Sequence, residues 1–318
     1  MENSLEQFDI SENVVYSIAV ADSISMGQTK YQCFAATSNG LITSKDGTVW
    51  ENAYSSLNIS VPLTTTSVVV SPEFFNDHII ISGVSGGILR SEDEGGTWQT
   101  VLFPQPLPVI SCLALSPNFS ADGIVFAGTM EDGVFFSSDE GAHWVSWNFG
   151  LLDLNVLCIA ASPTFSEDET VFIGTESGIF KSTNGGRAWK EVVIQDNFVP
   201  TISLAISPNY GKDGMILAGT ESNGLYQSLD RGKTWEQIGD SILHDPINTI
   251  LFSPDFANDH KVILVAGGTI FYSDDMGKSW IQDQSLPPSL EITTAYLTKS
   301  KMLWYGTVGA RVYNKHIN

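Results

Sequence analysis

Apolar residues occur in short runs along the whole chain, and glycine, proline, serine or aspartate ends most of these runs. Residues 124–129 (Ile-Val-Phe-Ala-Gly-Thr) and 133–137 (Gly-Val-Phe-Phe-Ser) are two examples. Runs of this length, rich in β-branched and aromatic residues and bounded by turn formers, predict short strands. Because no stretch repeats with the helical period of 3.6 residues, we expect an all-β chain.

A box ending in tryptophan recurs through the chain. Its tryptophans stand at positions 50, 98, 144, 189, 235 and 280, so successive copies are 45 to 48 residues apart. The copies are variants of the pattern Ser-x-Asp-x-Gly-x-Thr-Trp, which residues 91–98 and 228–235 match in full. The box residues are Ser44, Asp46 and Trp50; Ser91, Asp93, Gly95 and Trp98; Ser137, Asp139, Gly141 and Trp144; Ser182, Asn184 and Trp189; Ser228, Asp230, Gly232 and Trp235; and Ser273, Asp275, Gly277 and Trp280. An internal repeat of this period indicates a repeat architecture.

A second motif, Ser-Pro-x-Phe-x-x-Asp, precedes each box from the second onward, with Tyr210 replacing phenylalanine in one copy. Between the motifs, each unit has room for four short strands, a to d. In the third unit we expect them at 111–115, 124–128, 134–137 and 144–147. Four strands in a unit of this length are typical of a β-propeller blade.

The blade count follows from the ends of the chain. After Trp280 three further strands are expected, at 292–297, 303–307 and 310–313, and residues 5–10 can supply the missing fourth. The sequence therefore predicts one domain, 1–318, folded as a seven-bladed β-propeller of four-stranded antiparallel blades. Its last blade would consist of about 291–318 plus 5–10, so that the N-terminal strand closes the ring.

Strand a has a small residue at the same position in every blade. First strands crowd around the axis of a propeller, so small side chains are expected there. The residues are Ser17, Ser67, Cys112, Cys158, Ser203, Thr249 and Thr294. This explains two of the three cysteines, which show no CxxC spacing and therefore predict neither a disulfide framework nor a zinc site.

The charge balance limits the possible partners. The chain carries 36 Asp and Glu against 15 Lys and Arg, a formal net charge of -21. Neither nucleic acid nor an anionic membrane surface is expected as a partner. Because residues 1–13 are acidic and have no apolar run, we expect no signal peptide, no transmembrane segment and a cytoplasmic location.

The boxes resemble the Asp box of BNR-repeat propellers, a family that includes sialidases, the sortilin ectodomain, two-domain xyloglucanases and a photosystem II assembly factor. The resemblance implies that each box is a hairpin between strands c and d, with its Asp and Ser side chains bonded to the turn backbone. The first box is one residue short, Asn184 replaces the aspartate of the fourth box, and His143 replaces the threonine of the third. We expect those three hairpins to be looser.

The residues of known Asp-box enzymes are largely missing. A sialidase needs three arginines around a carboxylate, and this chain has only Arg90, Arg187, Arg231 and Arg311, two of them inside boxes. Two-domain xyloglucanases place two aspartates between two propellers, whereas one ring has no second half. The five histidines show no metal-binding spacing, and no cofactor is expected. We therefore expect a chain that is not an enzyme, with carbohydrate binding or glycoside hydrolysis as the alternative.

The face that carries the d-to-a and b-to-c loops is the predicted binding surface. Its d-to-a loops mix prolines with large apolar side chains, as protein interfaces do, and its b-to-c turns add carboxylates. The candidate partner-binding residues are Phe103, Leu107, Glu131, Asp132, Phe149, Leu151, Leu152, Glu176, Phe198, Glu221, Ile242, Leu243 and Leu286. The predicted function is a protein-interaction or assembly scaffold within a larger complex. The alternative is that the apolar residues only fill the junctions between blades.

Overall fold

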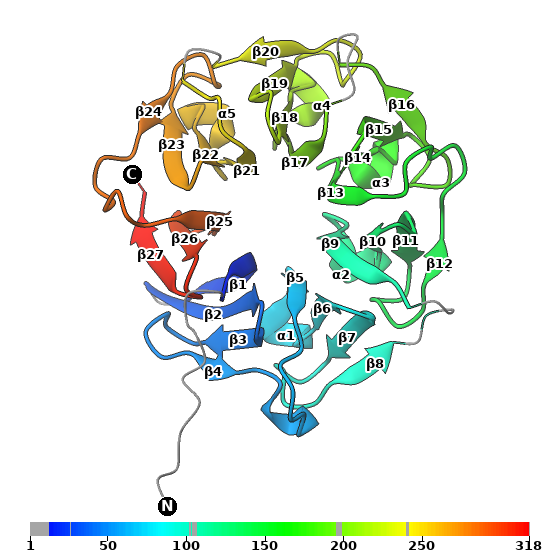
Figure 1. Ribbon diagram of the computed structural model, residues 1–318, viewed down its shortest axis with the longest axis vertical. Helices are drawn as coiled ribbons and strands as arrows, with labels where there is room; N and C mark the ends of the chain where they lie inside the picture. The colour runs from blue at the N-terminus through cyan, green and yellow to red at the C-terminus, as the bar shows by residue number, and fades with distance from the viewer. Residues whose placement is uncertain are drawn as a thin grey trace, which may run out of the picture.

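The computed structural model describes residues 13–25, 27–101, 103, 107–194, 199–239 and 242–317. Seven small antiparallel sheets form a ring around a central axis (Figure 1). Six sheets have four strands, and the seventh has three among the described residues. The predicted seven-bladed β-propeller is confirmed.

Each sheet is one continuous stretch of chain, with its strands in sequence order from the axis outward. Blades 1 to 3 are β1 (Val15–Ser25), β2 (Gln28–Thr37), β3 (Gly40–Ser44) and β4 (Glu51–Asn52); β5 (Thr65–Val70), β6 (Ile80–Val84), β7 (Gly87–Ser91) and β8 (Gln99–Val101); and β9 (Val109–Leu115), β10 (Val125–Met130), β11 (Val134–Ser137) and β12 (Val145–Ser146). Blades 4 and 5 are β13 (Val156–Ala161), β14 (Val171–Thr175), β15 (Gly178–Ser182) and β16 (Lys190–Val192); and β17 (Thr201–Ile206), β18 (Ile216–Thr220), β19 (Leu225–Ser228) and β20 (Glu236–Ile238). Blades 6 and 7 are β21 (Ile247–Phe252), β22 (Val262–Ala266), β23 (Thr269–Ser273) and β24 (Ile281–Gln282); and β25 (Ile292–Leu297), β26 (Met302–Thr307) and β27 (Val312–His316).

The last blade differs from the prediction in its third strand. Strand β27 begins at Val312, two residues later than expected, because Gly309 and Ala310 form the turn that precedes it and have φ of 86° and 53°. The predicted fourth strand, residues 5–10, lies outside the described residues.

The first and last blades meet directly within the described chain. Val14 bridges Val308, and the Thr293 hydroxyl donates to the Val15 carbonyl over 2.6 Å. Higher along the same junction, the Ser300 amide donates to Asp22 Oδ2 over 2.9 Å. Because these contacts join positions almost a full chain apart, they close the ring.

Glycines in strand b set the spacing between blades. A Cβ added at Gly128 would lie 2.5 Å from Cys112 Sγ and 2.7 Å from Val156 Cγ1 of the next blade. Gly83, Gly174, Gly219 and Gly306 stand in the same way against Ile110, Thr201, Ile247 and Val15 of their neighbours. The small residues predicted on strand a therefore form half of a close contact, and the strand-b glycines form the other half.

The Ser-Pro motifs form short helical turns at the end of strand a. The turns are α1 (Phe74–Asp77), α2 (Phe119–Asp122), α3 (Phe165–Asp168), α4 (Tyr210–Asp213) and α5 (Phe256–Asp259), and residues Ser55–Leu57 form one 3-10 turn. In α2 the Asp122 carboxylate accepts the Ser116 hydroxyl at 2.6 Å and the Ile124 amide at 2.9 Å, while Phe119 is buried. Within the described ranges, none of the helices has the length and apolar character needed to cross a membrane.

The boxes are the predicted hairpins between strands c and d. In the fifth box Ser228 Oγ accepts the Gly232 amide at 2.9 Å, and Asp230 Oδ1 accepts the Thr234 amide at 2.9 Å. The variant boxes keep this arrangement, since Asn184 Oδ1 accepts the Ala188 amide and His143 Nδ1 lies 2.7 Å from Asp139 Oδ2. The first box keeps it too, since Ser44 Oγ accepts the Gly47 amide and Asp46 Oδ1 accepts the Thr48 amide, and the expected looseness of the three hairpins stays a prediction. Trp98 and Trp189 donate to carbonyls of the preceding blade, at Ala53 and Trp147, so these two boxes also link sheets. Trp50 and Trp144 donate to a glycine carbonyl of their own box.

Candidate functional site

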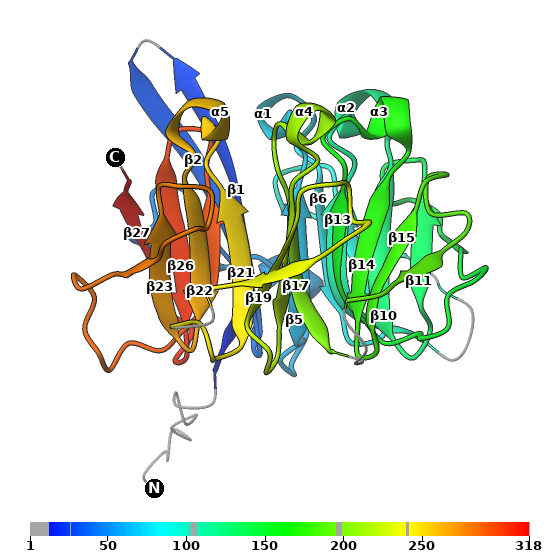
Figure 2. The same cartoon turned by 90° about the horizontal axis from the view of Figure 1, so that it is seen from above.

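The ring has two different faces. Figure 2 shows α1 to α5 along one edge of the ring, and the ends of β1 and β2 extend past them. We call this side, which also carries the boxes, the helical-turn face. The opposite side carries the b-to-c turns and the d-to-a connections, and we call it the loop face.

The connection between blades 3 and 4, residues 149–154, is anchored along its length. The Phe149 carbonyl accepts the Trp189 amide at 2.9 Å, and the Leu154 carbonyl accepts the Gly133 amide at 3.0 Å. Asp153 Oδ2 accepts the Ser177 amide at 2.7 Å. The loop is thus bonded both to the b-to-c turn of blade 3 and to that of blade 4.

This anchored loop presents two large apolar side chains to solvent. Phe149 is 80% exposed and Leu152 is 79% exposed, whereas Leu151 between them is only 8% exposed and packs with Phe136 and Trp189. Gly150, with φ of 79°, makes the turn that separates the two environments. Of the three predicted residues on this loop, Phe149 and Leu152 can contact a partner, and Leu151 fills the junction between blades.

The other predicted apolar residues divide in the same way. Phe103 and Leu243 are buried in the junctions between blades, and Leu286 is partly buried. Leu107 and Ile242 are about half exposed. The predicted candidate Phe198 lies outside the described residues.

The loop face also carries carboxylates in its b-to-c turns and d-to-a connections. Of the predicted acids, Glu131, Glu176 and Glu221 are exposed and Asp132 is half-buried. With Asp153, Asp245, Asp283 and Glu291 they make eight carboxylates in the described loops; Asp283 pairs with Lys315, and the other seven have no basic group of the described residues within ion-pairing distance. Arg311 is the one basic residue in the described loops of this face, because the other lysines and arginines lie in strands, a-to-b turns or boxes.

A shallow hollow lies beside Leu152. It has a volume of about 430 Å³ and is lined by Leu152, Asp153, Leu154, Ser177, Phe180 and Glu191. Apolar carbon and two carboxylates therefore border the same space, which suits a side chain with an aliphatic stem and a positive end.

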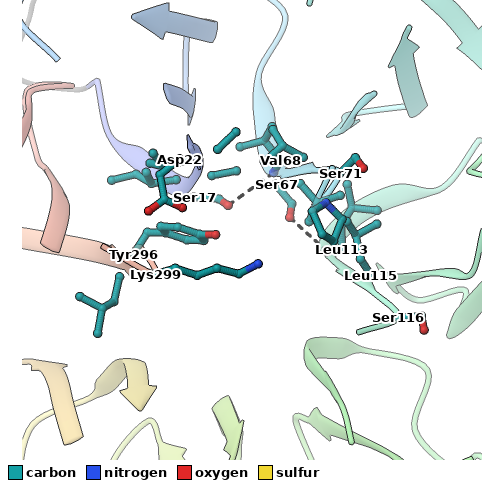
Figure 3. Close-up of a pocket in the computed structure, with 18 residues that line it drawn as sticks. Ser17, Asp22, Ser67, Val68, Ser71, Leu113, Leu115, Ser116, Tyr296 and Lys299 are labelled. Atoms are coloured by element: carbon teal, nitrogen blue, oxygen red, sulfur yellow. Dashed lines mark hydrogen bonds between the residues drawn. The ribbon is translucent and has the colours of Figure 1, made fainter. Parts of the chain in front are cut away.

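The sequence analysis missed a second cavity, at the axis on the helical-turn face. Its volume is about 470 Å³, and its walls come from strand a of blades 1, 2, 3 and 7. Figure 3 shows Asp22, Tyr296 and Lys299 on one side of this cavity, with Ser67 and Leu113 opposite. These residues are far apart in the sequence, and only an alignment of the repeats against one another could have pointed to them.

The described residues offer little for catalysis. Asp22 is the only carboxylate among the described residues that line the axial cavity, whereas glycoside hydrolysis uses a pair. Across the described ranges, no three His, Cys, Asp or Glu side chains gather as metal ligands would. The three cysteines are free, and burial raises the pKa of the Cys112 thiol to about 12, which disfavours the reactive thiolate.

The ring of seven blades with its repeated boxes defines an Asp-box β-propeller. The sequence profile described as the BNR-Asp box repeat matches residues 225–238, which include the fifth box. No curated protein matches the chain at the level of sequence.

Several solved structures share the fold. A structure of YCF48 bound to D1 peptide has a TM-score of 0.72 and 13% identity, with 97% of this chain and 95% of that chain covered. The GH74 xyloglucanase from Xanthomonas campestris has a TM-score of 0.70 and 14% identity, with 96% and 52% covered. The extracellular domain of a putative one-component system from B. thetaiotaomicron has a TM-score of 0.72 and 14% identity, with 96% and 38% covered. This chain thus spans well under half of the last protein, and at such identities the similarity shows the fold alone.

Proposed function

We propose that this propeller is a non-catalytic protein-binding scaffold whose loop face binds a basic partner protein. The observation that carries the proposal is the exposure of Phe149 and Leu152 on an anchored loop. Large apolar side chains at the centre of an interface supply much of its binding free energy. Burying each of them would contribute about 1.5–3 kcal/mol.

The anchoring of the loop also favours binding. Before any partner arrives, residues 149–154 are bonded to the two neighbouring b-to-c turns through the Gly133 and Ser177 amides, and to the end of the fourth box through the Trp189 amide. Association would therefore lose little of the chain entropy that ordering a loose loop costs.

The carboxylates of the loop face define the charge of the partner. Because Glu131, Glu176 and Glu221 lack basic neighbours, their field extends into solvent and attracts positive charge. Such a field mainly raises the association rate and excludes acidic partners. A lysine or arginine of the partner would fit the hollow beside Leu152, between Asp153 and Glu191.

The structurally similar proteins include both kinds. YCF48 bound to D1 peptide supports protein binding, whereas the GH74 xyloglucanase is an enzyme. The single carboxylate of the axial cavity favours the non-catalytic alternative. Action within a larger assembly and a cytoplasmic location are further parts of the proposal, and cell fractionation with size-exclusion chromatography tests both.

A pulldown with matched variants tests the binding face. We expect Phe149→Ala combined with Leu152→Asp to lose a partner that the parent chain captures from the source cells. Leu229→Asp is the control, because Leu229 is 62% exposed in a box on the other face. Equal capture by the parent chain and both variants would refute binding through the loop face. Sustained release of reducing sugar from polysaccharides would refute the non-catalytic part.

Charge reversal tests the electrostatic part. Glu131→Lys, Glu176→Lys and Glu221→Lys together should slow association at least tenfold at low salt and leave dissociation nearly unchanged. Glu51→Lys, Glu167→Lys and Glu236→Lys form the control set, since these exposed residues lie outside the loop face. An association rate that falls equally in both sets would contradict a role for these particular carboxylates.

A further inference from the structure

The repeat departs from its pattern at one position of strand a. Five residues after the small residue, five blades have proline: Pro72, Pro117, Pro163, Pro208 and Pro254. The equivalent residues of blades 1 and 7 are Asp22 and Lys299. Blades 1 and 7 are neighbours in the closed ring, so an acid and a base replace proline in adjacent blades, Asp22 on β1 and Lys299 in the turn after β25.

The same two blades change the surroundings of this position. Without proline, β1 continues past the helical turns, and Asp22 lies on a strand and not in a turn (Figure 2). Asp22 is held there by the Ser300 amide, which donates to its Oδ2 over 2.9 Å. Asp22 thus has a fixed place at the cavity wall.

Tyr296 is a second departure. Other blades have aliphatic residues at its position, namely Ala19, Val69, Ala114, Ala160, Ala205 and Leu251. In Figure 3 the Tyr296 hydroxyl and the Lys299 ammonium extend into the same space. Burial and the nearby Asp22 charge raise the pKa of Tyr296 to about 12, so the hydroxyl keeps its proton at neutral pH.

The polar groups of the cavity are mostly donors without acceptors. Ser17 Oγ and Ser67 Oγ each accept an amide of the next blade, from Val68 at 3.4 Å and from Leu113 at 3.1 Å, so their hydroxyl protons are left to donate. Tyr296 and Lys299 add further donors. Lys299 forms no ion pair with Asp22 or with any other described acid.

We propose that the axial cavity binds an aliphatic α-amino acid. Its carboxylate lies against the Lys299 ammonium and the Tyr296 and Ser67 hydroxyls, and its ammonium lies against Asp22. The side chain packs on the aliphatic wall of Val68, Val70, Leu113, Leu115 and Leu297. A zwitterion satisfies both charges, whereas an ion of either sign would leave one of them unpaired. A volume of about 470 Å³ is in the range of small-molecule sites.

Calorimetry with leucine and two probes that keep its isobutyl side chain tests this. L-Leucine should bind to the full chain. 4-Methylpentanoate, which lacks the ammonium, and 3-methylbutylamine, which lacks the carboxylate, should each bind at least tenfold more weakly. No heat from leucine at millimolar concentration overturns the proposal, and so does equal binding of either truncated probe.

Variants test the roles of the side chains. Asp22→Asn should weaken leucine about tenfold and strengthen 4-methylpentanoate, because it removes the charge that this probe leaves unpaired, whereas Lys299→Met and Tyr296→Phe should weaken both. Lys278→Met and Asp245→Asn are controls outside the cavity and should bind as the parent does. Circular dichroism verifies that each variant is folded. Because the cavity lies on the helical-turn face, the variants of the loop face should leave leucine binding unchanged, so this site and the proposed protein interface fail separately.

Discussion

Truncation of two adjacent leucines on the loop between blades 3 and 4 should change the free energy of unfolding by very different amounts. Leu151 is 8% exposed and belongs to the cluster with Phe136 and Trp189, whereas Leu152 is 79% exposed. Buried Leu→Ala substitutions cost about 2–5 kcal/mol, and a site in a loop can partly collapse, so we expect about 2–3 kcal/mol for Leu151→Ala. For Leu152→Ala we expect a change within about 0.5 kcal/mol.

Urea denaturation followed by tryptophan fluorescence measures the difference. With an m-value of about 3 kcal/mol per molar, Leu151→Ala should lower the midpoint by about 1 M. Leu152→Ala should keep the midpoint of the parent and lose partner capture. Equal shifts of the midpoint would mean that the structure has the two leucines in the wrong environments. The proposed binding of a partner through Leu152 would then fail as well.

Three further predictions concern the repeat itself. Gly128→Ala should cost about 1–3 kcal/mol, because its Cβ would lie 2.5 Å from Cys112 Sγ; Gly211→Ala, with its nearest neighbour at 3.6 Å, is the control, and equal urea midpoints would contradict this packing. The Thr234 amide and hydroxyl lower the pKa of Asp230 to about 2, so its contribution to stability is present above the unfolded pKa of about 3.9 and is lost as the pH falls towards 2. Asp230→Asn should therefore reduce the loss of stability between pH 4 and pH 2, and an unchanged slope in urea denaturation would contradict it. Thr293→Val removes the hydroxyl that donates to the Val15 carbonyl and should lower the free energy of unfolding by about 1 kcal/mol. Thr48→Val, in an exposed box turn, should lower it less.

The sequence was enough to predict the ring, because each blade repeats the same turn chemistry at nearly constant intervals. Ser228 and Asp230 bond the turn backbone as the box pattern implies, and strand c of the third blade has the predicted bounds. The turns α1 to α5 were not predicted as helices, because one turn of four residues is too short to show a helical period. The extension of β1 was not predicted either, because its only sign in the sequence is that the first blade lacks a Ser-Pro motif.

The binding surface was predicted less completely than the ring. The composition of residues 149–154 indicated apolar side chains on the loop face, but it gave no means of separating Leu151 from Leu152. Their environments differ because Gly150 turns the chain and the Trp189 amide fixes Phe149 beside the next blade. The axial cavity depends on Asp22, Ser67 and Tyr296 from three blades, so its composition emerges only when the ring is closed.

Photo-crosslinking in the source cells tests most directly whether the loop face binds a protein. A photoreactive phenylalanine analogue is placed at position 149 and, as the matched control, at position 229 on the opposite face. We expect a covalent adduct with one major protein at position 149, weakened by Leu152→Asp and absent at position 229. No adduct at position 149, or the same adducts at both positions, would contradict it.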